Sequence, residues 1–418
     1  MANNLIKSGY VTALDIGSGK ICCMIAKVSD DNISIIGMGY AQSQGIKNGV
    51  IVNLTQAAGS IQDAIIDAET KAHKKVESVI VNISSPQLAS VYVSAEITIP
   101  ENRVIIPSDV RKVIDLALAK IDLKEKEIIH QIPISYSLDG QTDIGDEPTG
   151  LSGKVLGVTL HLITVPLVQI RNLSMALERC HVWMAGKVAT PYASALSVLT
   201  QSEKDGGSTL IDIGSGIASM AIFSNGFIKY VNVLPLGGNL ITKDISYVLK
   251  TPLKDAERAK TLQGSAFVAP EDEKNTVTLP LIGEEDEGIT TTVSRKTLVS
   301  IISARIEQIF EFLSMYLLSQ EKDDFATRRI VLCGGVSQTV GLAEKASTML
   351  GAQVRCGKPV YIKGLSETIP MTTMSTAIGL LLYAMNHRIQ KEDKKIKKQS
   401  NKQPNWIKKV LKWIIQNF

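Results

Sequence analysis

The sequence predicts a duplicated α/β protein, on the evidence of a repeated pentapeptide, its apolar flanks and a third glycine-containing turn. Residues 11–26 and 208–223 both contain Asp-Ile-Gly-Ser-Gly between two apolar segments, which is the pattern of a tight β-hairpin. Residues 328–346 read as an apolar strand, a Gly-Gly turn and a helix that starts near Ser337, a favourable N-cap. The 418 residues suffice for about two to four domains, and 44% hydrophobic residues is ordinary for a globular protein.

The two pentapeptides place Asp15 and Asp212 at the ends of apolar strands. A carboxylate in such a position is costly unless it is paired or faces a cation. The backbone N–H groups of a glycine-rich turn form a concavity that binds anions. Two such hairpins facing each other would hold a polyphosphate, with the two aspartates holding a hydrated Mg²⁺. Two ordinary hairpins with solvated aspartates are the alternative, which the matching context of the two copies disfavours.

Several functional classes are excluded by the sequence. No Gly-Lys pair is followed by Ser or Thr, so there is no P-loop, and neither His-Glu-x-x-His nor Gly-x-Ser-x-Gly occurs. The five cysteines form no Cys-x-x-Cys pair, so we expect buried free thiols in a reducing compartment. No apolar run approaches the ~18 residues that span a bilayer, so we expect a cytosolic chain with peripheral membrane contact at most. Residues 1–390 carry a net charge of −3 and residues 391–418 carry +7, which argues against a nucleic-acid-binding body and for a tail with its own partner.

The basic tail divides into a linker and a short amphipathic segment. Residues 391–404 are charged and poor in apolar side chains, so we expect a disordered linker. At 100° per residue, residues 405–418 gather apolar side chains on one face and lysines on the other. Trp and Lys suit a helix at the headgroup boundary of a membrane, so this helix is predicted to bind anionic lipid; a helix docked on the body or in a partner's groove is the alternative. The predicted membrane-binding residues are Trp406, Ile407, Lys408, Lys409, Val410, Leu411, Lys412, Trp413, Ile414, Ile415 and Phe418.

The order of these motifs resembles that of the actin, sugar-kinase and DnaK-type chaperone superfamily. Residues 189–200, 235–260 and 373–384 resemble, more closely, the FtsA family of bacterial cell-division proteins. The resemblance implies an α/β, duplicated actin-like (ribonuclease-H-like) fold with two inserted subdomains and a C-terminal amphipathic helix. The implied parts are a first core half (1–83 and 162–200), an insert for polymer and partner contacts (84–161), a second core half (201–245 and 326–388), an insert for a partner peptide (246–325), a flexible basic linker (389–404) and a membrane-targeting helix (405–418).

The resemblance also implies a binding site for ATP and Mg²⁺. Asp15 and Asp212 would hold Mg²⁺, partly through water, and Glu257 with Lys260 would contact the nucleoside. The alternative for that last pair is a surface ion pair, which contributes little. The implied nucleotide-binding residues are Asp15, Gly17, Ser18, Gly19, Lys20, Asp212, Gly214, Ser215, Gly216, Gly238, Glu257, Lys260, Gly334, Gly335 and Val336.

The chain departs from the superfamily pattern at three positions. Ile217 replaces a Thr of the second turn, and Ser219 replaces an acidic residue that is common there. Thr190 precedes Pro191 where relatives that hydrolyse ATP carry a Glu, and Thr cannot deprotonate water as a carboxylate can. We therefore assign no catalytic residue, and we expect slow ATP hydrolysis or none.

The resemblance implies an actin-like adaptor that polymerises on the cytoplasmic face of the inner membrane at the division site. Its tail would bind anionic lipid, and its second insert would bind the C-terminal peptide of the tubulin-like division protein FtsZ, with later division proteins as further partners and no nucleic acid. Arg295, Lys296 and Arg305 lie on a stretch expected to be helical, residues 294–313, and are candidates for that peptide; a solvated basic face is the alternative. A sugar or small-molecule kinase, and an actin-like scaffold of a pilus or secretion machine, are the alternative functions.

Overall fold

The computed structural model describes residues 9–29, 32–100, 103–142, 148–284, 288–318, 328–365 and 370–400, with side chains described as far as His387. The predicted membrane-binding segment, residues 405–418, lies outside the described residues. None of the described helices is long and apolar enough to cross a membrane.

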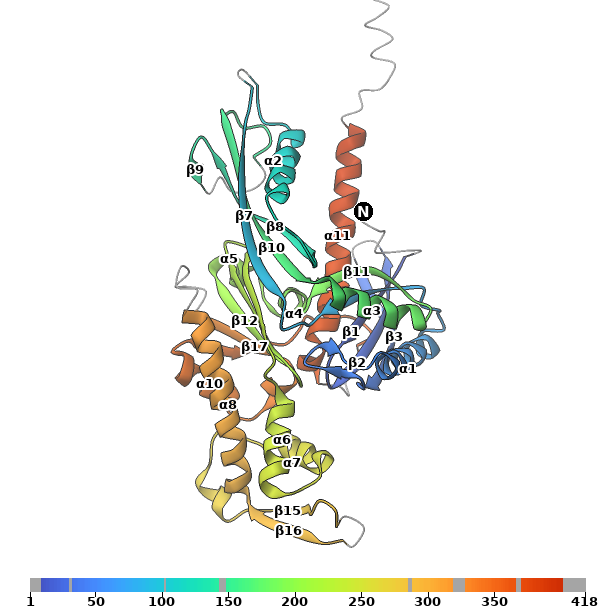
Figure 1. The fold of residues 1–418 in the computed structure, drawn as a ribbon, viewed down its shortest axis with the longest axis vertical. Coiled ribbons are helices and arrows are strands. Elements are labelled where there is room, and N and C mark those ends of the chain that lie inside the picture. The colour runs from blue at the N-terminus through green and yellow to red at the C-terminus, as the bar shows by residue number, and fades with distance from the viewer. Residues whose placement is uncertain are drawn as a thin grey trace, which may run out of the picture.

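Two five-stranded sheets of the same topology form the centre of the molecule (Figure 1). In each sheet three antiparallel strands are followed by two parallel strands, so the orders β3-β2-β1-β6-β11 and β14-β13-β12-β17-β18 correspond strand by strand. This correspondence confirms the predicted duplication. The strands of the first sheet are β1 (Tyr10–Ile16), β2 (Lys20–Ser29), β3 (Asn32–Gln42), β6 (Ser78–Ile83) and β11 (Trp183–Ala189), and those of the second are β12 (Ser208–Ile213), β13 (Ala218–Ser224), β14 (Phe227–Leu234), β17 (Arg329–Cys333) and β18 (Gln353–Cys356).

The helices cover both faces of the sheets, which is why the central strands β1 and β12 are buried along nearly their whole length. Helices α1 (Leu54–Ala72) and α3 (Leu167–Arg179) cover one face of the first sheet. Two helices are exchanged between the halves. Helix α4 (Thr190–Val198), at the end of the first half, packs on the second sheet, and α11 (Ser375–Ser400), at the end of the second half, packs on the first.

Helices α4 and α11 cross in close contact at the centre of the molecule. A Cβ atom on Gly379 of α11 would lie 1.8 Å from the carbonyl oxygen of Ala193 on α4. Only glycine therefore permits this separation of the two helices. The remaining short elements of the two halves are β4 (Ile46–Lys47), β5 (Val50–Ile51), α5 (Gln201–Gly206), the 3₁₀ helices η2 (Gly335–Gln338) and η3 (Met371–Met374), and α10 (Leu342–Leu350).

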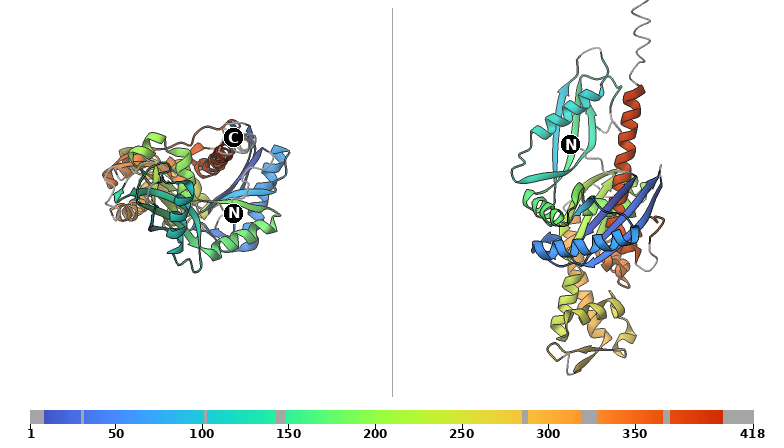
Figure 2. Two further views of the ribbon diagram at one scale, coloured as in Figure 1. Left: turned by 90° about the horizontal axis from the view of Figure 1, so that it is seen from above. Right: turned by 90° about the vertical axis from the view of Figure 1, so that its right-hand side faces the viewer.

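Two further groups of elements lie at opposite ends of the molecule (Figures 1 and 2). One is a separate sheet with the order β7-β10-β8-β9, whose own core packs against α2. The expected helix over residues 294–313 is confirmed as part of α8. The first group comprises β7 (Ala89–Thr98), α2 (Pro107–Ala119), β8 (Lys126–Leu138), β9 (Gln141–Thr142) and β10 (Val155–Pro166), and the second comprises α6 (Gly238–Leu249), α7 (Leu253–Gln263), η1 (Pro270–Glu273), β15 (Thr276–Pro280), β16 (Thr290–Ser294) and α8 (Arg295–Leu318).

Three expectations about local structure are wrong. Ser337 does not begin an α-helix: its hydroxyl donates to the Gly334 carbonyl at 2.7 Å within a 3₁₀ turn, and α10 begins only after Gly341, whose φ is +76°. Helix α11 continues to Ser400 into the predicted linker, because residues 389–400 hold many Lys, Glu and Gln and no Gly or Pro, and extending a helix costs far less than nucleating one. All five cysteines are free, but Cys356, the last residue of the edge strand β18, is exposed, and Cys180 is only half-buried.

Candidate nucleotide site between the two hairpin turns

The two pentapeptides form the same turn. The Gly17 N–H donates to the Lys20 carbonyl at 3.0 Å, and the Gly214 N–H donates to the Ile217 carbonyl at 2.9 Å. Each turn joins the central strand of its sheet to the next antiparallel strand. Identical local sequence therefore gives an identical closing hydrogen bond in both halves.

The two turns face each other with reciprocal contacts. A Cβ atom on Gly19 would lie 2.6 Å from Ser215 Oγ, and a Cβ atom on Gly216 would lie 2.5 Å from Ser18 Oγ. The last glycine of each turn thus packs against the serine of the other. Because a side chain at either glycine would push the turns apart, the two glycines set how closely the turns approach each other.

The two aspartates lie near enough to each other for their charges to interact. Asp15 and Asp212 are 9% and 8% exposed. Burial raises the pKa of Asp15 to about 7, with Lys20 opposing this rise and the charge of Asp212 adding to it. Burial also raises the pKa of Asp212, which hydrogen bonds from Ser194 and Thr376 oppose. Lys20 extends from the first turn to donate to the Thr373 carbonyl at 2.7 Å.

This pair of carboxylates fits a hydrated divalent cation. Two buried carboxylates that repel each other need a positive charge between them, and a cation there lowers both pKa values. Mg²⁺ retains several waters and takes few protein oxygens, which suits two aspartates better than a cage of many ligands. Among the described residues no group of three or more His, Cys, Asp or Glu side chains is arranged to hold a metal.

The Gly-Gly turn after β17 lies against Asp212. Gly334 has a φ of +87°, and a Cβ atom there would lie 2.4 Å from Asp212 Oδ1. Both the left-handed backbone and the contact with the carboxylate therefore require glycine. Helix α6 begins beside the second turn, where the Gly238 N–H donates to the Gly214 carbonyl at 3.0 Å. A Cβ atom on Gly238 would meet Val336 Cγ2 at 3.0 Å and Lys260 Nζ at 3.2 Å, so these predicted residues also converge.

Lys260 is anchored rather than free on the surface. Its side chain is 15% exposed, and its Nζ donates to Glu257 Oε2 at 2.5 Å, Thr242 Oγ1 at 2.9 Å and the Gly238 carbonyl at 3.2 Å. The Thr242 hydroxyl donates in turn to Glu257. Sequence reasoning missed Thr242, although it follows Gly238 by four residues on α6 and so shares its face.

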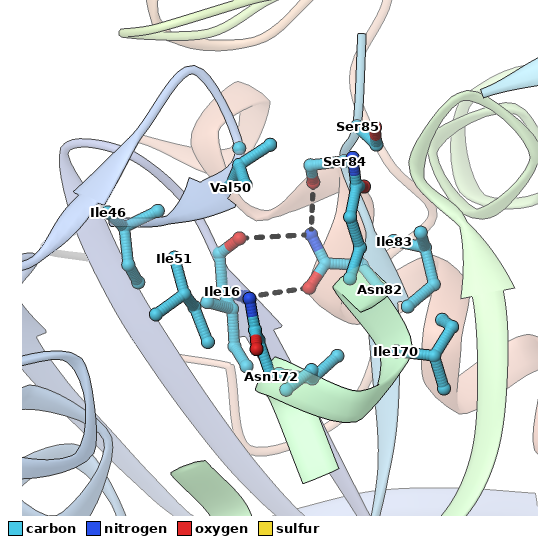
Figure 3. A pocket seen from close by; sticks show the side chains of 13 residues that line it. Ile16, Ile46, Val50, Ile51, Asn82, Ile83, Ser84, Ser85, Ile170 and Asn172 are labelled. Carbon is cyan, nitrogen blue, oxygen red and sulfur yellow. Dashed lines mark hydrogen bonds between the residues drawn. The ribbon is translucent and has the colours of Figure 1, made fainter. Parts of the chain in front are cut away.

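Thr190 has its hydroxyl engaged by protein groups. The residue is 6% exposed. Its hydroxyl oxygen lies 2.6 Å from Ser84 Oγ, donates to the Ile83 carbonyl at 3.1 Å and accepts from Asn82 Nδ2 at 3.2 Å. Asn82, which sequence reasoning also missed, accepts a hydrogen bond from the Ile16 N–H at 2.7 Å and so holds the base of the first turn (Figure 3). A small pocket of about 30 Å³ adjoins this network, and its other walls are mostly apolar, with Gln169 and Asn172 as further polar residues.

The three basic candidates for a partner peptide lie on the first turns of α8. The Arg295 guanidinium pairs with the buried Asp272 and donates to the Gln263 carbonyl at 3.0 Å. Arg305 forms a two-pronged pair with Asp244 at 2.5 and 2.8 Å, whereas Lys296 reaches only the exposed Glu273 at 3.2 Å. The two arginines hold the subdomain together by these pairs, and their role toward a partner stays a prediction.

The duplicated sheets, the exchanged helices and the facing turns define an actin-like protein, and solved structures agree. The type IV pilus PilM–PilN complex aligns over 90% of this chain and 98% of its own, with a TM-score of 0.61 at 15% identity. MreB5 of Spiroplasma citri bound to AMPPNP aligns over 93% of this chain and 99% of its own, with a TM-score of 0.57 at 13% identity. The MamK double helical filament aligns over 90% of this chain and 98% of its own, with a TM-score of 0.53 at 13% identity.

Sequence comparison then gives the family. The family model for cell division protein FtsA matches residues 209–379, and that for the SHS2 domain inserted in FtsA matches residues 86–164. The cell division protein FtsA of Agrobacterium fabrum is 36% identical over 388 residues, 90% of this chain and 87% of its own. That of Escherichia coli K12 is 30% identical over 416 residues, 98% of each chain. The chain belongs to the FtsA family of cell division proteins, as the sequence motifs predicted.

Proposed function

We propose that this protein binds ATP with Mg²⁺ between its two hairpin turns and acts as a membrane-tethered, polymerising adaptor in cell division. The observation that carries the nucleotide site is the reciprocal contact of Gly19 with Ser215 and of Gly216 with Ser18. It brings two glycine-rich turns and two carboxylates to one place, and glycine-rich turns with free N–H groups suit a polyphosphate. The similar fold of MreB5, solved with AMPPNP, supports the same ligand class.

Each group at the site has a distinct proposed role. Both turns would donate backbone N–H groups to the phosphates, and the Gly334 turn would leave room for the nucleoside beside Lys260. Asp15 and Asp212 would hold Mg²⁺ through its waters. Bound there, Mg²⁺ would neutralise phosphate charge. Lys20 lies near both carboxylates and would add a further positive charge.

Slow hydrolysis is part of the proposal. The Thr190 hydroxyl is engaged by Ile83, Ser84 and Asn82, so it has no free lone pair or proton with which to orient water. We expect Mg-ATP binding by calorimetry, and we expect Asp212→Ala to weaken it. Steady-state turnover at ~1 s⁻¹ or above, as in kinases, would contradict this part of the proposal.

The tail and the partner contacts are proposed from the sequence and from membership of the family. Residues 405–418 would bind anionic lipid on the cytoplasmic face of the inner membrane at the division site. The subdomain around α8 would bind the C-terminal peptide of FtsZ, with Lys296 as its most exposed basic candidate. Copies of the chain would assemble into a filament, as MamK does in its solved structure, and later division proteins would bind that filament.

A liposome flotation assay tests the tail. The full chain should float with anionic vesicles, and removal of residues 405–418 or the change Trp406→Glu should abolish flotation while Mg-ATP binding is retained. Asp212→Ala should show the reverse pattern. Full flotation of the Trp406→Glu variant would refute the membrane assignment, and failure of an FtsZ tail peptide to bind the full chain would refute the adaptor role.

A further inference from the structure

Hydroxyl groups from the two crossing helices hold the carboxylate of Asp212. Ser194 Oγ, from α4, donates to Asp212 Oδ2 at 2.6 Å, and the hydroxyl of Thr376, from α11, lies close enough to interact with the same carboxylate. Ser194 Oγ and Thr376 Oγ1 lie 3.0 Å apart. The acidic group of the second turn is therefore fixed from outside its own strand by both exchanged helices.

The surroundings leave this carboxylate little freedom. Ser194 is fully buried, and Thr376 and Asp212 are each 8% exposed. Gly334 lies against Asp212 Oδ1, so the turn after β17 confines one carboxylate oxygen while Ser194 holds the other. Hydrogen bonds from hydroxyl groups to an ionised carboxylate are among the stronger ones, and here they stabilise its charged form against burial.

The corresponding aspartate of the first turn lacks this support. Asp15 occupies the same place in an identical pentapeptide, yet among the described residues no hydroxyl group donates to its carboxylate. Its principal favourable interaction is with the charge of Lys20. The two carboxylates are therefore equivalent in sequence and different in setting, with Asp212 as the one whose orientation is fixed in advance.

From this difference we infer that Ser194 and Thr376 are positioning residues, which orient Asp212 for the magnesium ion of a bound nucleotide. The inference rests on the proposed nucleotide-binding function and deepens it. Neither hydroxyl group needs to touch the nucleotide, because each acts through the carboxylate it holds. Loss of either hydroxyl group should therefore weaken only the part of the ATP-binding free energy that depends on Mg²⁺.

The test compares ATP affinity in excess Mg²⁺ with ATP affinity in EDTA, using the full chain and calorimetry. The ratio of ATP affinity in Mg²⁺ to ATP affinity in EDTA is the gain from Mg²⁺. We expect Ser194→Ala and Thr376→Val each to reduce this gain about tenfold, since the loss of a hydrogen bond to a charged group has roughly that effect. Affinity in EDTA should stay within about twofold of wild type. Thr376→Ser keeps the hydroxyl group and should keep the wild-type gain.

Ser197→Ala is the matched control. Ser197 lies on the same helix, is 1% exposed and also bridges the two helices, because its hydroxyl contacts the Ser375 carbonyl at 2.7 Å and the Ser194 carbonyl at 2.9 Å. It does not contact Asp212, so its loss should lower stability without changing the gain from Mg²⁺.

Each outcome of this experiment is decisive. The inference is overturned if Ser194→Ala and Thr376→Val keep the wild-type gain, or if Ser197→Ala loses as much as they do. Should Ser194→Ala fail to fold, the pair Thr376→Val and Thr376→Ser decides the matter. A wild-type chain that binds ATP well but gains nothing from Mg²⁺ overturns this inference and the proposed Mg²⁺ site but leaves the ATP site standing, whereas a chain that binds no ATP overturns the proposed nucleotide site as a whole.

Discussion

Replacing Gly216 by Ala tests whether the contact between the two turns sets the nucleotide site. The backbone of Gly216 lies outside the left-handed region, so alanine introduces no strain in φ. Its new Cβ atom would lie 2.5 Å from Ser18 Oγ and 2.6 Å from Ser18 Cβ. Unstrained contacts are near 3.5 Å, so the turns must separate by about 1 Å. Ser18 cannot simply rotate away, because its Oγ accepts a hydrogen bond from the Gly49 N–H at 2.8 Å.

A displacement of this size should misplace the N–H groups of one turn relative to the phosphates. Each hydrogen bond to a charged group contributes about 1.5–3 kcal/mol, so Mg-ATP should bind Gly216→Ala about tenfold to a hundredfold more weakly in calorimetry. Gly59→Ala is the control: Gly59 lies in α1 with no atom within 4 Å of the added Cβ, so it should stabilise the fold slightly and leave ATP affinity unchanged. Wild-type affinity in Gly216→Ala would refute the reasoning.

Three further predictions concern stability, measured by urea unfolding. Gly334→Ala forces a side chain into a backbone with φ of +87°, so it should lower the unfolding free energy by at least about 1–2 kcal/mol; an unchanged midpoint would contradict this. Gly379→Ala places a Cβ atom 1.8 Å from the Ala193 carbonyl oxygen and should cost more, because two helix backbones must move apart; a cost below that of Gly334→Ala would count against it. Burial lowers the pKa of His130 to about 3 and that of His161 to about 4. The unfolded chain therefore takes up these protons first, so each histidine should add a loss of stability that begins below pH ~6.5 and grows toward pH 4, by at most about 1.4 kcal/mol per pH unit. The raised pKa of Asp15 acts in the opposite sense, so the contribution of a histidine is measured as the difference in pH profile between the wild type and His161→Gln; identical profiles would refute this.

The hairpins, the duplication and the facing turns could be predicted because their signals are local and repeated. An apolar strand, Gly-Ser-Gly and a second apolar strand determine a turn without reference to the rest of the chain. The start of α10 was predicted wrongly because the local signal, a serine that suits an N-cap, is used by another contact. Ser337 is a good N-cap by type, but its hydroxyl is used within the turn by Gly334, and the positive φ of Gly341 delays the helix.

The residues that support the site could not be predicted, because their partners are distant in the sequence. Asn82 and Thr190 meet across 108 positions, and Ser194 and Thr376 meet across 182. In the sequence each is a small polar residue within an apolar segment, which is equally typical of a helix cap or a packing position. Only the crossing of α4 and α11 brings these hydroxyl groups to a carboxylate.

The exchange of helices explains why the two halves cannot act independently. Helix α4 follows the first sheet but packs on the second, and α11 does the opposite, so each half depends on a helix of the other for part of its core. The base of the first insert is attached at the same place. His130 of β8 accepts a hydrogen bond from the Ala189 N–H at 3.0 Å, directly before α4, and its ring packs edge-on against Tyr383 of α11 with centroids 5.6 Å apart. Through this one buried side chain the insert contacts both the start of α4 and helix α11.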